Sequence, residues 1–208
     1  TVQSYMLEFG DQYMRVFKDG GRVMMASKTI TGITLGAQIT ITSVGHGYAN
    51  GDWLILSGIV GTTELNDMTV VVSDKGTDDF KIKDVDGNYI DGSSFTGYSS
   101  AGIAEKVYEL TTTYTAADIS LLKIVQSADV LYVFHPSYKP RKITRTGHAA
   151  WTITDITWVP GIAAPTLVSP GGSGSQYIIT TVSTEGEESL ISNEVTSAPG
   201  QTLTWGAV

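Results

Sequence analysis

The densest group of side chains that could act together chemically lies in one short basic segment. Lys139, Arg141, Lys142 and Arg145 are four of the 13 basic residues of the chain. Because side chains alternate between the two faces of a strand, Arg141 and Arg145 would share a face and Lys142 would point away. These cations form a candidate interaction patch for DNA or for an acidic neighbouring subunit. The alternative is a solvated strand whose charges prevent edge-to-edge aggregation, which the acidic composition favours.

The three histidines give no sign of a metal or catalytic site. His46 lies between two glycines, His135 precedes a proline, and His148 follows a glycine in an expected hairpin tip. No two of them belong to a short motif such as H-x-x-x-H, which would place both on one face of a helix. Each histidine is therefore expected in a turn or at the surface.

The second candidate site in the sequence is a calcium-binding loop. The segment Asp84-Val85-Asp86-Gly87-Asn88, followed by Asp91, gathers the oxygen ligands that a hard cation requires. The EF-hand spacing, however, needs its glycine later and a glutamate at the twelfth position, which is absent. Asp86-Gly87 also suits a hairpin turn, which is the preferred interpretation. We therefore predict no catalytic residue, no metal site and no cofactor.

The four tryptophans could form platforms for sugar rings. Trp53, Trp151, Trp158 and Trp205 each lie within or beside an alternating segment. Packing in a core or an interface is therefore the expected role. Paired acids such as Asp78-Asp79 fall in turns, where solvated charge is ordinary.

Composition excludes several classes of protein. Hydrophobic residues make up 41% of the chain and charged residues 16%, which is incompatible with a disordered chain. The formal net charge of −8 disfavours general nucleic-acid binding, which needs Lys and Arg to neutralise phosphates. The absence of cysteine excludes disulfides, thiolate metal sites and a cysteine nucleophile. No apolar run approaches the roughly 18 residues that a membrane helix needs, so no membrane insertion is expected.

Two separate stretches of alternating sequence predict one discontinuous β-meander domain. In residues 1–27, strands are expected at 5–9, 12–17 and 22–26, with turns at Gly10-Asp11 and at 18–21. In residues 105–160, strands are expected at 130–135, 141–146 and 151–157. A short helix, 116–122, would precede them, with a capping box between Thr115 and Asp118. Such antiparallel meanders build open sheets and propeller blades.

The remaining segments predict a small inserted domain and an incomplete final module. Within residues 28–104, short strands at 38–44, 52–57, 68–73 and 79–83 alternate with glycine turns, which predicts a small β-barrel. Residues 161–174 form a Pro/Gly-rich linker. Residues 175–208 hold strands at 176–183 and 194–197 and form a partial β-sandwich module. The expected fold class is all-β and antiparallel throughout.

The meander stretches carry motifs that resemble proteins encoded in phages and prophages. The motifs are Leu7-Glu8-Phe9-Gly10, Tyr13-Met14-Arg15-Val16-Phe17, Asp19-Gly20-Gly21, the run from Gln126 to Pro136, and the run from Pro140 to Gly147. These phage proteins are similar to the tail nozzle, or tail-tube-B, proteins of short-tailed phages. The resemblance covers residues 1–27 and 105–160. It implies a ring-forming structural protein with β-propeller architecture.

Two further resemblances concern the insert and the C-terminal segment. Val44-Gly45-His46-Gly47-Tyr48-Ala49-Asn50-Gly51-Asp52 and the run from Gly61 to Asn66 resemble the first catalytic cysteine half-domain of ubiquitin-activating enzymes. The chain lacks cysteine and a Gly-rich nucleotide loop, so this resemblance implies a fold without the activity. The run from Tyr177 to Val182, with Gly186-Glu187-Glu188-Ser189 and Leu203-Thr204-Trp205, looks like strands of a fibronectin type III module. A whole sandwich of that kind needs about 100 residues, so this one is incomplete.

The leading hypothesis is a non-enzymatic structural component of a phage tail or virion. It would act by self-assembly as a homo-oligomer and by contact with other phage tail proteins. The basic residues between Lys139 and Arg145 would make transient contact with DNA that passes through the tail. The protein would be assembled in the host cytoplasm and reside in the virion tail. The start at Thr1 and the strand-like last residues also suggest a fragment of a longer polypeptide.

Two other classes of function stay open. The first alternative is a module that recognises a host-surface glycan and displays the insert and the final module for that purpose. The second is an enzyme that degrades cell wall or polysaccharide, whose mark would be paired carboxylates in a cleft. The enzyme ranks below the other two, because no such pair can be inferred from the spacing.

Overall fold

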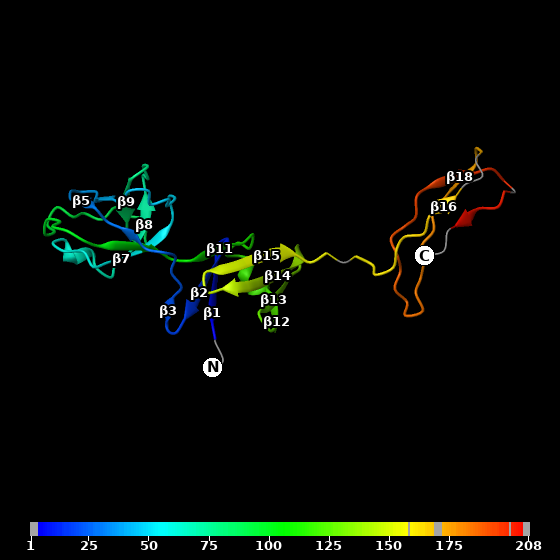
Figure 1. Ribbon diagram of the computed structural model, residues 1–208, viewed down its shortest axis with the longest axis horizontal. Helices are drawn as coiled ribbons and strands as arrows, with labels where there is room; N and C mark the ends of the chain where they lie inside the picture. Colours follow the sequence, from blue (N-terminus) through cyan, green and yellow to red (C-terminus); the bar gives the residue numbers. More distant parts are fainter. Residues whose placement is uncertain (1–3, 158, 169–171, 200, 206–208) are drawn as a thin grey trace. The chain divides into compact units, whose positions relative to one another are not determined.

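The computed structural model describes residues 4–157, 159–168, 172–199 and 201–205. The chain divides into two compact units, Thr1–Asp155 and Ile156–Val208. All of the paired strands are antiparallel, and helical structure in the described residues is limited to two 3-10 turns, Thr63–Leu65 and Ile119–Leu121. Figure 1 shows this strand-dominated architecture. The expectation of an all-β, antiparallel fold is confirmed.

The N-terminal strands form a four-stranded sheet whose last member comes from far along the chain. Its strands are β1 (Met6–Gly10), β2 (Tyr13–Lys18), β3 (Gly21–Arg22) and β11 (Glu109–Thr111). Asp19 and Gly20 form the two-residue turn between β2 and β3, and their φ angles of 52° and 84° are those that a type I′ hairpin turn requires. Pairing of Glu109 with Arg15 brings β11 alongside β2.

The middle segment forms a seven-stranded sheet around its own hydrophobic core. The strand order is β4-β10-β7-β8-β9-β6-β5, with bounds Lys28–Thr29, Ile103–Lys106, Trp53–Ser57, Thr69–Ser73, Asp79–Lys83, Thr40–Thr42 and Gly32–Thr34. Alternate residues of β7, β8 and β9 are buried, as a half-buried strand requires. Lys28 pairs with Ala104, so the two ends of the segment lie side by side.

The expected small β-barrel is not closed by a hydrogen-bonded ladder in the described residues. Strands β4 and β5 stand at opposite ends of the sheet order, yet only Ile30 and Thr31 separate them in the chain. The Ile30 amide donates to the carbonyl of Gly102, which directly precedes β10. The Thr31 amide donates instead to the carbonyl of Thr42 on β6. The sheet therefore curls so far that one continuous segment, residues 28–34, supplies both of its edge strands. The hydrogen-bonded ladder breaks between Ile30 and Thr31.

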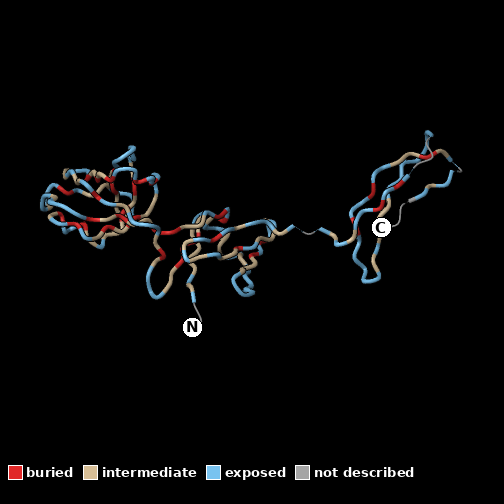
Figure 2. The backbone as a smooth tube through the Cα atoms, viewed as in Figure 1, coloured by how far each residue is buried: buried red, intermediate tan, exposed pale blue. Residues whose placement is uncertain are grey.

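A third sheet packs against the first and shares one core with it. Its strands follow one another as β12 (Lys123–Ser127), β13 (Val130–His135), β14 (Tyr138–Gly147) and β15 (Ala150–Asp155). Val133, Ile143 and Trp151 from this sheet are buried together with Met14 and Val16 from β2. The buried residues of this unit thus form two groups, one for each core (Figure 2).

The expected helix over residues 116–122 is wrong, because only the 3-10 turn Ile119–Leu121 forms. One half of the capping box is present, with the Thr115 amide donating to Asp118 Oδ2 at 2.8 Å. The same carboxylate oxygen also accepts from the Thr115 hydroxyl at 2.8 Å and from the Tyr138 hydroxyl at 3.1 Å. These bonds tie Asp118 to β14, and the chain becomes extended again at Leu122.

The second unit consists of two small sheets. Strand β16 (Leu167–Val168) pairs with β19 (Thr204–Trp205), and β17 (Ser175–Tyr177) pairs with β18 (Val195–Ser197). Most of this unit is exposed (Figure 2), and Leu167 is its only buried large hydrophobic residue among those described. Trp158, Pro170, Gly171 and the side chain of Trp205, for which the sequence predicts packing or linker roles, lie outside the described residues.

Serine hydroxyls explain why the expected strand 176–183 shortens to Ser175–Tyr177. The Ser192 amide donates to the Ile179 carbonyl at 2.9 Å, but the Ile179 amide donates to Ser192 Oγ at 3.1 Å rather than to a carbonyl. Thr181 and Ser189 repeat this arrangement, with 3.0 Å from the Thr181 amide to Ser189 Oγ. Side chains thus replace backbone acceptors, and regular ladder pairing ends.

Replacement of Ser192 by alanine should loosen this serine-bonded segment. The Ile179 amide would lose its acceptor, at a cost of about 1–2 kcal/mol. Hydrogen exchange at the Ile179 amide should therefore accelerate in Ser192→Ala. Ser197→Ala is the matched control, because the Ser197 hydroxyl is also buried in this unit but bonds to a carbonyl and not to an amide. Equal acceleration in both variants would contradict this account.

Candidate functional site

All four residues of the basic segment lie on β14, but the structure divides them into two pairs. Arg141 Nε lies 2.8 Å from Asp155 Oδ1, and Arg145 Nη2 lies 2.6 Å from Asp129 Oδ1. Lys139 and Lys142 are exposed and have no ion pair with any described residue. The two arginines are therefore neutralised locally, and contact with DNA, which stays a prediction, would depend mainly on the two lysines.

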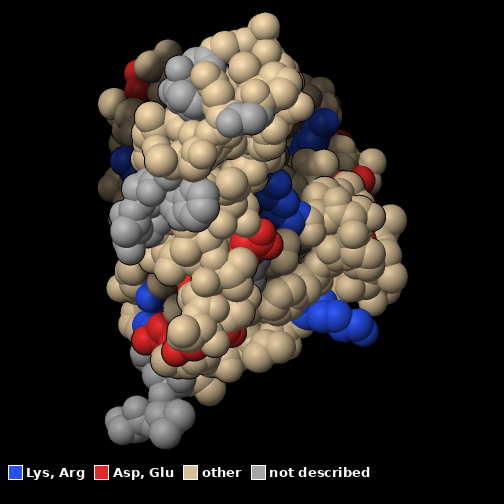
Figure 3. Space-filling model, turned by 90° about the vertical axis from the view of Figure 1, so that its right-hand side faces the viewer, with Lys and Arg blue, Asp and Glu red and all other residues tan. Residues whose placement is uncertain are grey.

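The two arginines share a face of the sheet, as their spacing predicts. Within the regular part of β14, Arg141 pairs with Asp155, Ile143 with Ile153 and Arg145 with Trp151. Ile143 is buried in the core, so this face is turned toward the first sheet, whereas Lys142 lies on the opposite face. The four cations consequently do not form one continuous patch. In the space-filling view of Figure 3, Lys and Arg side chains appear as separate blue groups.

Arg145 belongs to a polar and aromatic cluster that the sequence analysis missed. Its Nη1 donates to the Tyr5 hydroxyl at 3.3 Å, and that hydroxyl lies 2.6 Å from His148 Nδ1. The Tyr5 ring meets Trp151 edge-on, with 5.6 Å between the ring centroids. Beside this cluster lies a cavity of about 310 Å³. No local motif marks it, because its lining comes from both ends of the first unit.

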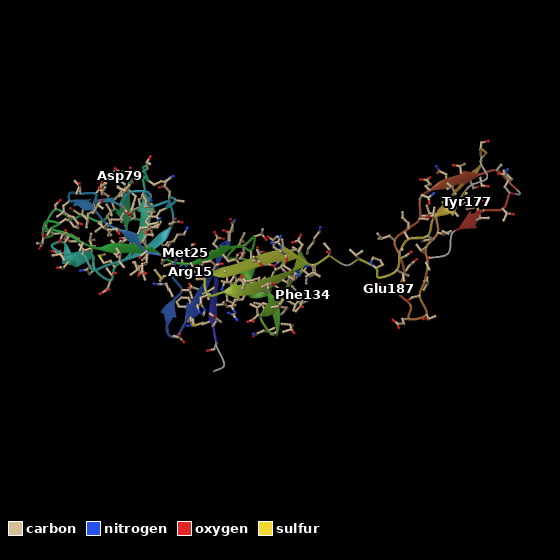
Figure 4. All side chains as sticks on the ribbon, in the orientation of Figure 1. Arg15, Met25, Asp79, Phe134, Tyr177 and Glu187 are labelled. Carbon is tan, nitrogen blue, oxygen red and sulfur yellow. The ribbon has the colours of Figure 1, made fainter. Side chains whose placement is uncertain are left out.

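A second arginine, Arg15, lies buried where the first sheet meets the seven-stranded sheet (Figure 4). Its guanidinium is stacked between the rings of Tyr13 and Trp53, at 4.3 and 3.8 Å from their centroids. Both Nε and Nη2 donate to Glu109 Oε1 at 2.6 Å. The Lys106–Asp52 ion pair, at 2.7 Å, lies within the seven-stranded sheet, beside Trp53. The only sign of this site in the sequence is that Arg15 stands between two apolar residues, Met14 and Val16, which the structure buries.

Two of the histidines, His46 and His135, stabilise local conformation. His46 Nδ1 accepts from the Tyr48 amide at 2.9 Å, and His135 Nδ1 accepts from the Ser137 amide at 3.0 Å. Both bonds close turns two residues long. The Tyr48 hydroxyl donates to the Ala104 carbonyl at 2.8 Å, and burial raises the pKa of Tyr48 to about 12, so it remains a donor. His135 Nε2 lies 3.5 Å from Asp118 Oδ1 inside the core.

The segment considered for calcium is a hairpin turn. Asp84 Oδ1 accepts from the amides of Asp86 and Asn88 at 3.0 and 2.8 Å, and Gly87 has a φ of 89°. These bonds hold the pKa of Asp84 below its usual value, with the Asn88 amide as the largest cause. Among the described residues, no three His, Asp or Glu side chains gather as metal ligands would. Along the same described stretches, no helix is long and apolar enough to span a membrane.

Comparison with known protein families finds a match in the middle segment of the chain. Residues 37–108 match the FCCH domain of ubiquitin-activating enzyme E1, which is a non-catalytic domain of E1 enzymes. The match covers about a third of the chain and includes strands β6 to β10 of the seven-stranded sheet, but not β4 and β5. It agrees with the resemblance noted for residues 44–52 and 61–66. No curated protein matches the chain.

The assignment to phage tail proteins is corrected by this result. The family that matches is the E1 FCCH domain, and no relative supports a phage or virion origin. The motifs behind that assignment are alternating strands joined by turns at Gly20 and at 128–129, and β1–β3 and β12–β15 form such hairpins. Any antiparallel meander needs alternation and turn residues of this type, so the motifs describe a local geometry rather than a family.

Substitution of Arg15 by methionine should destabilise the first unit by about 2–4 kcal/mol. The change keeps much of the apolar contact but leaves Glu109 without its partner and removes the stacking on Trp53. Chemical denaturation followed by tryptophan fluorescence measures the loss. Lys18→Met is the control, because the Lys18–Asp19 pair is exposed and should contribute less than about 1 kcal/mol. Equal effects of the two substitutions would refute a special role for Arg15.

Acid should destabilise the protein partly through Asp84. A carboxyl group with a lowered pKa in the folded state contributes stability above its unfolded pKa and loses it as the pH falls through the folded pKa. The free energy of unfolding should therefore decline below about pH 4, and less steeply in Asp84→Asn than in the parent. Denaturant titrations at several pH values test this. Asp86→Asn, in the same turn, should retain the parental slope, because the Asp86 carboxylate accepts no hydrogen bond from a described residue.

Proposed function

We propose that this protein is a non-catalytic structural protein that acts by self-association and by contacts with neighbouring proteins. This part of the expected function does not depend on a virion. The match of residues 37–108 to a non-catalytic domain supports it. The observation that carries it is the unusual amount of apolar surface on the unit Ile156–Val208.

That unit exposes more large apolar side chains than it buries. Ile178, Leu190 and Ile191 are 52%, 62% and 60% exposed, and Tyr177, Val182, Val168 and Val159 are also exposed, whereas Leu167 is buried. Tyr177, labelled in Figure 4, lies on the two-stranded sheet of β17 and β18. Tyr177, Ile178 and Ile191 line one surface hollow. Exposed apolar surface of this kind marks an interaction site, because burial in an interface removes it from water.

Unpaired strand edges support the same proposal. Strand β12 stands at the edge of its sheet, and all five of its residues are exposed, including Ile124 and Val125. Among the described residues, strand β17 pairs only with β18, so its other edge is open. Unpaired N–H and C=O groups on such edges favour pairing with another chain.

The charge of the second unit predicts how association should respond to salt. Residues 156–208 contain four glutamates and neither lysine nor arginine. Copies that meet through this unit would repel each other at low ionic strength. Added salt should therefore strengthen association by screening the glutamates, while the apolar contribution persists.

Light scattering of the purified chain tests the proposal. We expect dimers or larger species whose fraction rises with concentration and with salt. Deletion of residues 164–208, or the triple substitution Ile178→Ser, Leu190→Ser and Ile191→Ser, should shift the chain toward monomer by removing apolar contact.

Val44→Ser is the matched control for this experiment. Val44 is 70% exposed but lies in the first unit, so its replacement should leave the oligomeric state unchanged. A parent chain that remains strictly monomeric at all concentrations, or that responds equally to Val44→Ser, would contradict the proposal.

A further inference from the structure

The cavity beside Arg145 has one polar wall and one aromatic wall. Its volume is about 310 Å³, at the small end of the range for ligand pockets. Gln126, Asp129 and Arg145 provide the polar wall, and Tyr5, Leu131 and Trp151 provide the apolar wall. These residues come from strands β12 to β15 and the chain just before β1, so the cavity is built mainly on regular structure rather than on long loops.

The polar wall offers donors and acceptors side by side with little net charge. Arg145 directs Nε and Nη2 at Asp129 Oδ1, at 3.0 and 2.6 Å, and Nη1 at the Tyr5 hydroxyl. A guanidinium has five N–H groups, so two have no partner among the described residues and can donate to a ligand. Asp129 Oδ2 has no hydrogen bond to a described residue, and the Asp129 side chain is 62% exposed. Gln126 Nε2 is held by the Ala128 carbonyl at 3.0 Å, which leaves its own carbonyl oxygen as an acceptor.

The aromatic wall is held in place from behind. Trp151 Nε1 donates to the His148 carbonyl at 2.9 Å, and the Trp151 amide donates to the Tyr108 hydroxyl at 2.9 Å. The Tyr5 ring stands nearly perpendicular to Trp151, at an interplanar angle of 86°. Fixed rings of this kind present apolar area at little cost in conformational entropy.

We propose that this cavity is a binding site for a short neutral saccharide. One hydroxyl of a vicinal pair donates to Asp129 Oδ2, and its neighbour accepts from a free N–H of Arg145. The C–H face of the sugar ring packs on the Tyr5 ring, and Trp151 contacts the edge of the sugar. An anion is disfavoured because Asp129 already neutralises Arg145, and a purely apolar ligand would leave the polar wall without partners.

This inference does not depend on the proposed self-association. The cavity lies within the unit Thr1–Asp155, and none of its lining residues belongs to the exposed apolar surface of the second unit. Binding should therefore survive the triple substitution Ile178→Ser, Leu190→Ser and Ile191→Ser. Loss of association and loss of saccharide binding are thus separate outcomes.

Titration of the full chain by ¹H–¹⁵N NMR tests the site. The probes are glucose, galactose, N-acetylglucosamine and their disaccharides, with glucuronate as the charged comparison and cyclohexanol as the ring without a vicinal pair. At least one neutral sugar should shift the Trp151 Nε1–H and Arg145 Nε–H signals saturably, with a Kd on the order of 1 mM. Glucuronate and cyclohexanol should bind at least about tenfold more weakly.

Two substitutions and one matched control complete the test. Asp129→Asn and Gln126→Ala change exposed residues of the wall and should each weaken binding about tenfold. Asp155→Asn alters the equivalent ion pair on the same strand, Arg141–Asp155, which lies outside the cavity, and should leave binding unchanged. The proposal is overturned if no neutral sugar binds saturably, if glucuronate binds as well, or if Asp155→Asn weakens binding as much as Asp129→Asn does.

Discussion

The buried guanidinium of Arg15 is the contact on which the arrangement of the first unit depends. It joins three strands that are distant in the sequence, because Glu109 belongs to β11 and Trp53 to β7 while Arg15 itself belongs to β2. A guanidinium can do this because its planar face stacks on rings while its edge donates to a carboxylate. Lysine, with a compact charge and no flat face, could not satisfy both contacts at once. The two hydrophobic cores of this unit thus meet across a polar contact rather than merging into one.

The two units follow different physical rules. In the first, alternating side chains fill two cores, and His46, His135 and Asp84 use their hydrogen bonds to stabilise turns. In the second, strands are two or three residues long, and serine hydroxyls substitute for carbonyls in the pairing. So little apolar burial offsets only a small part of the conformational entropy lost on ordering. The second unit is therefore the part of the protein whose stability gains most from contact with another molecule.

Local periodicity predicted elements that carry their own pattern and missed those defined by distant partners. The strands Asp79–Lys83 and Val130–His135 match the prediction, because each alternates and ends at a turn. Strands β10 and β11 were missed, since they are short and exist through pairing with β7 and β2. Strand β12 was missed because it is exposed along its whole length and shows no burial pattern. The cavity was missed because its lining residues are distant in the sequence. Tyr5 and Arg145 are 140 residues apart, and no spacing rule connects them.

The pairing of Lys28 with Ala104 has a consequence for the history of the chain. The strand that enters the seven-stranded sheet runs antiparallel beside the strand that leaves it, and Met24 and Val107 continue this contact outside the sheet. A segment whose two ends are neighbours can be gained or lost by a gene without a change of path in the host sheet. The match to an E1 domain, residues 37–108, ends close to this junction but begins after β4 and β5. The seven-stranded sheet therefore has the geometry of an inserted domain. In a chain without this domain, a short turn from Met24 to Val107 would suffice to connect the two meander stretches.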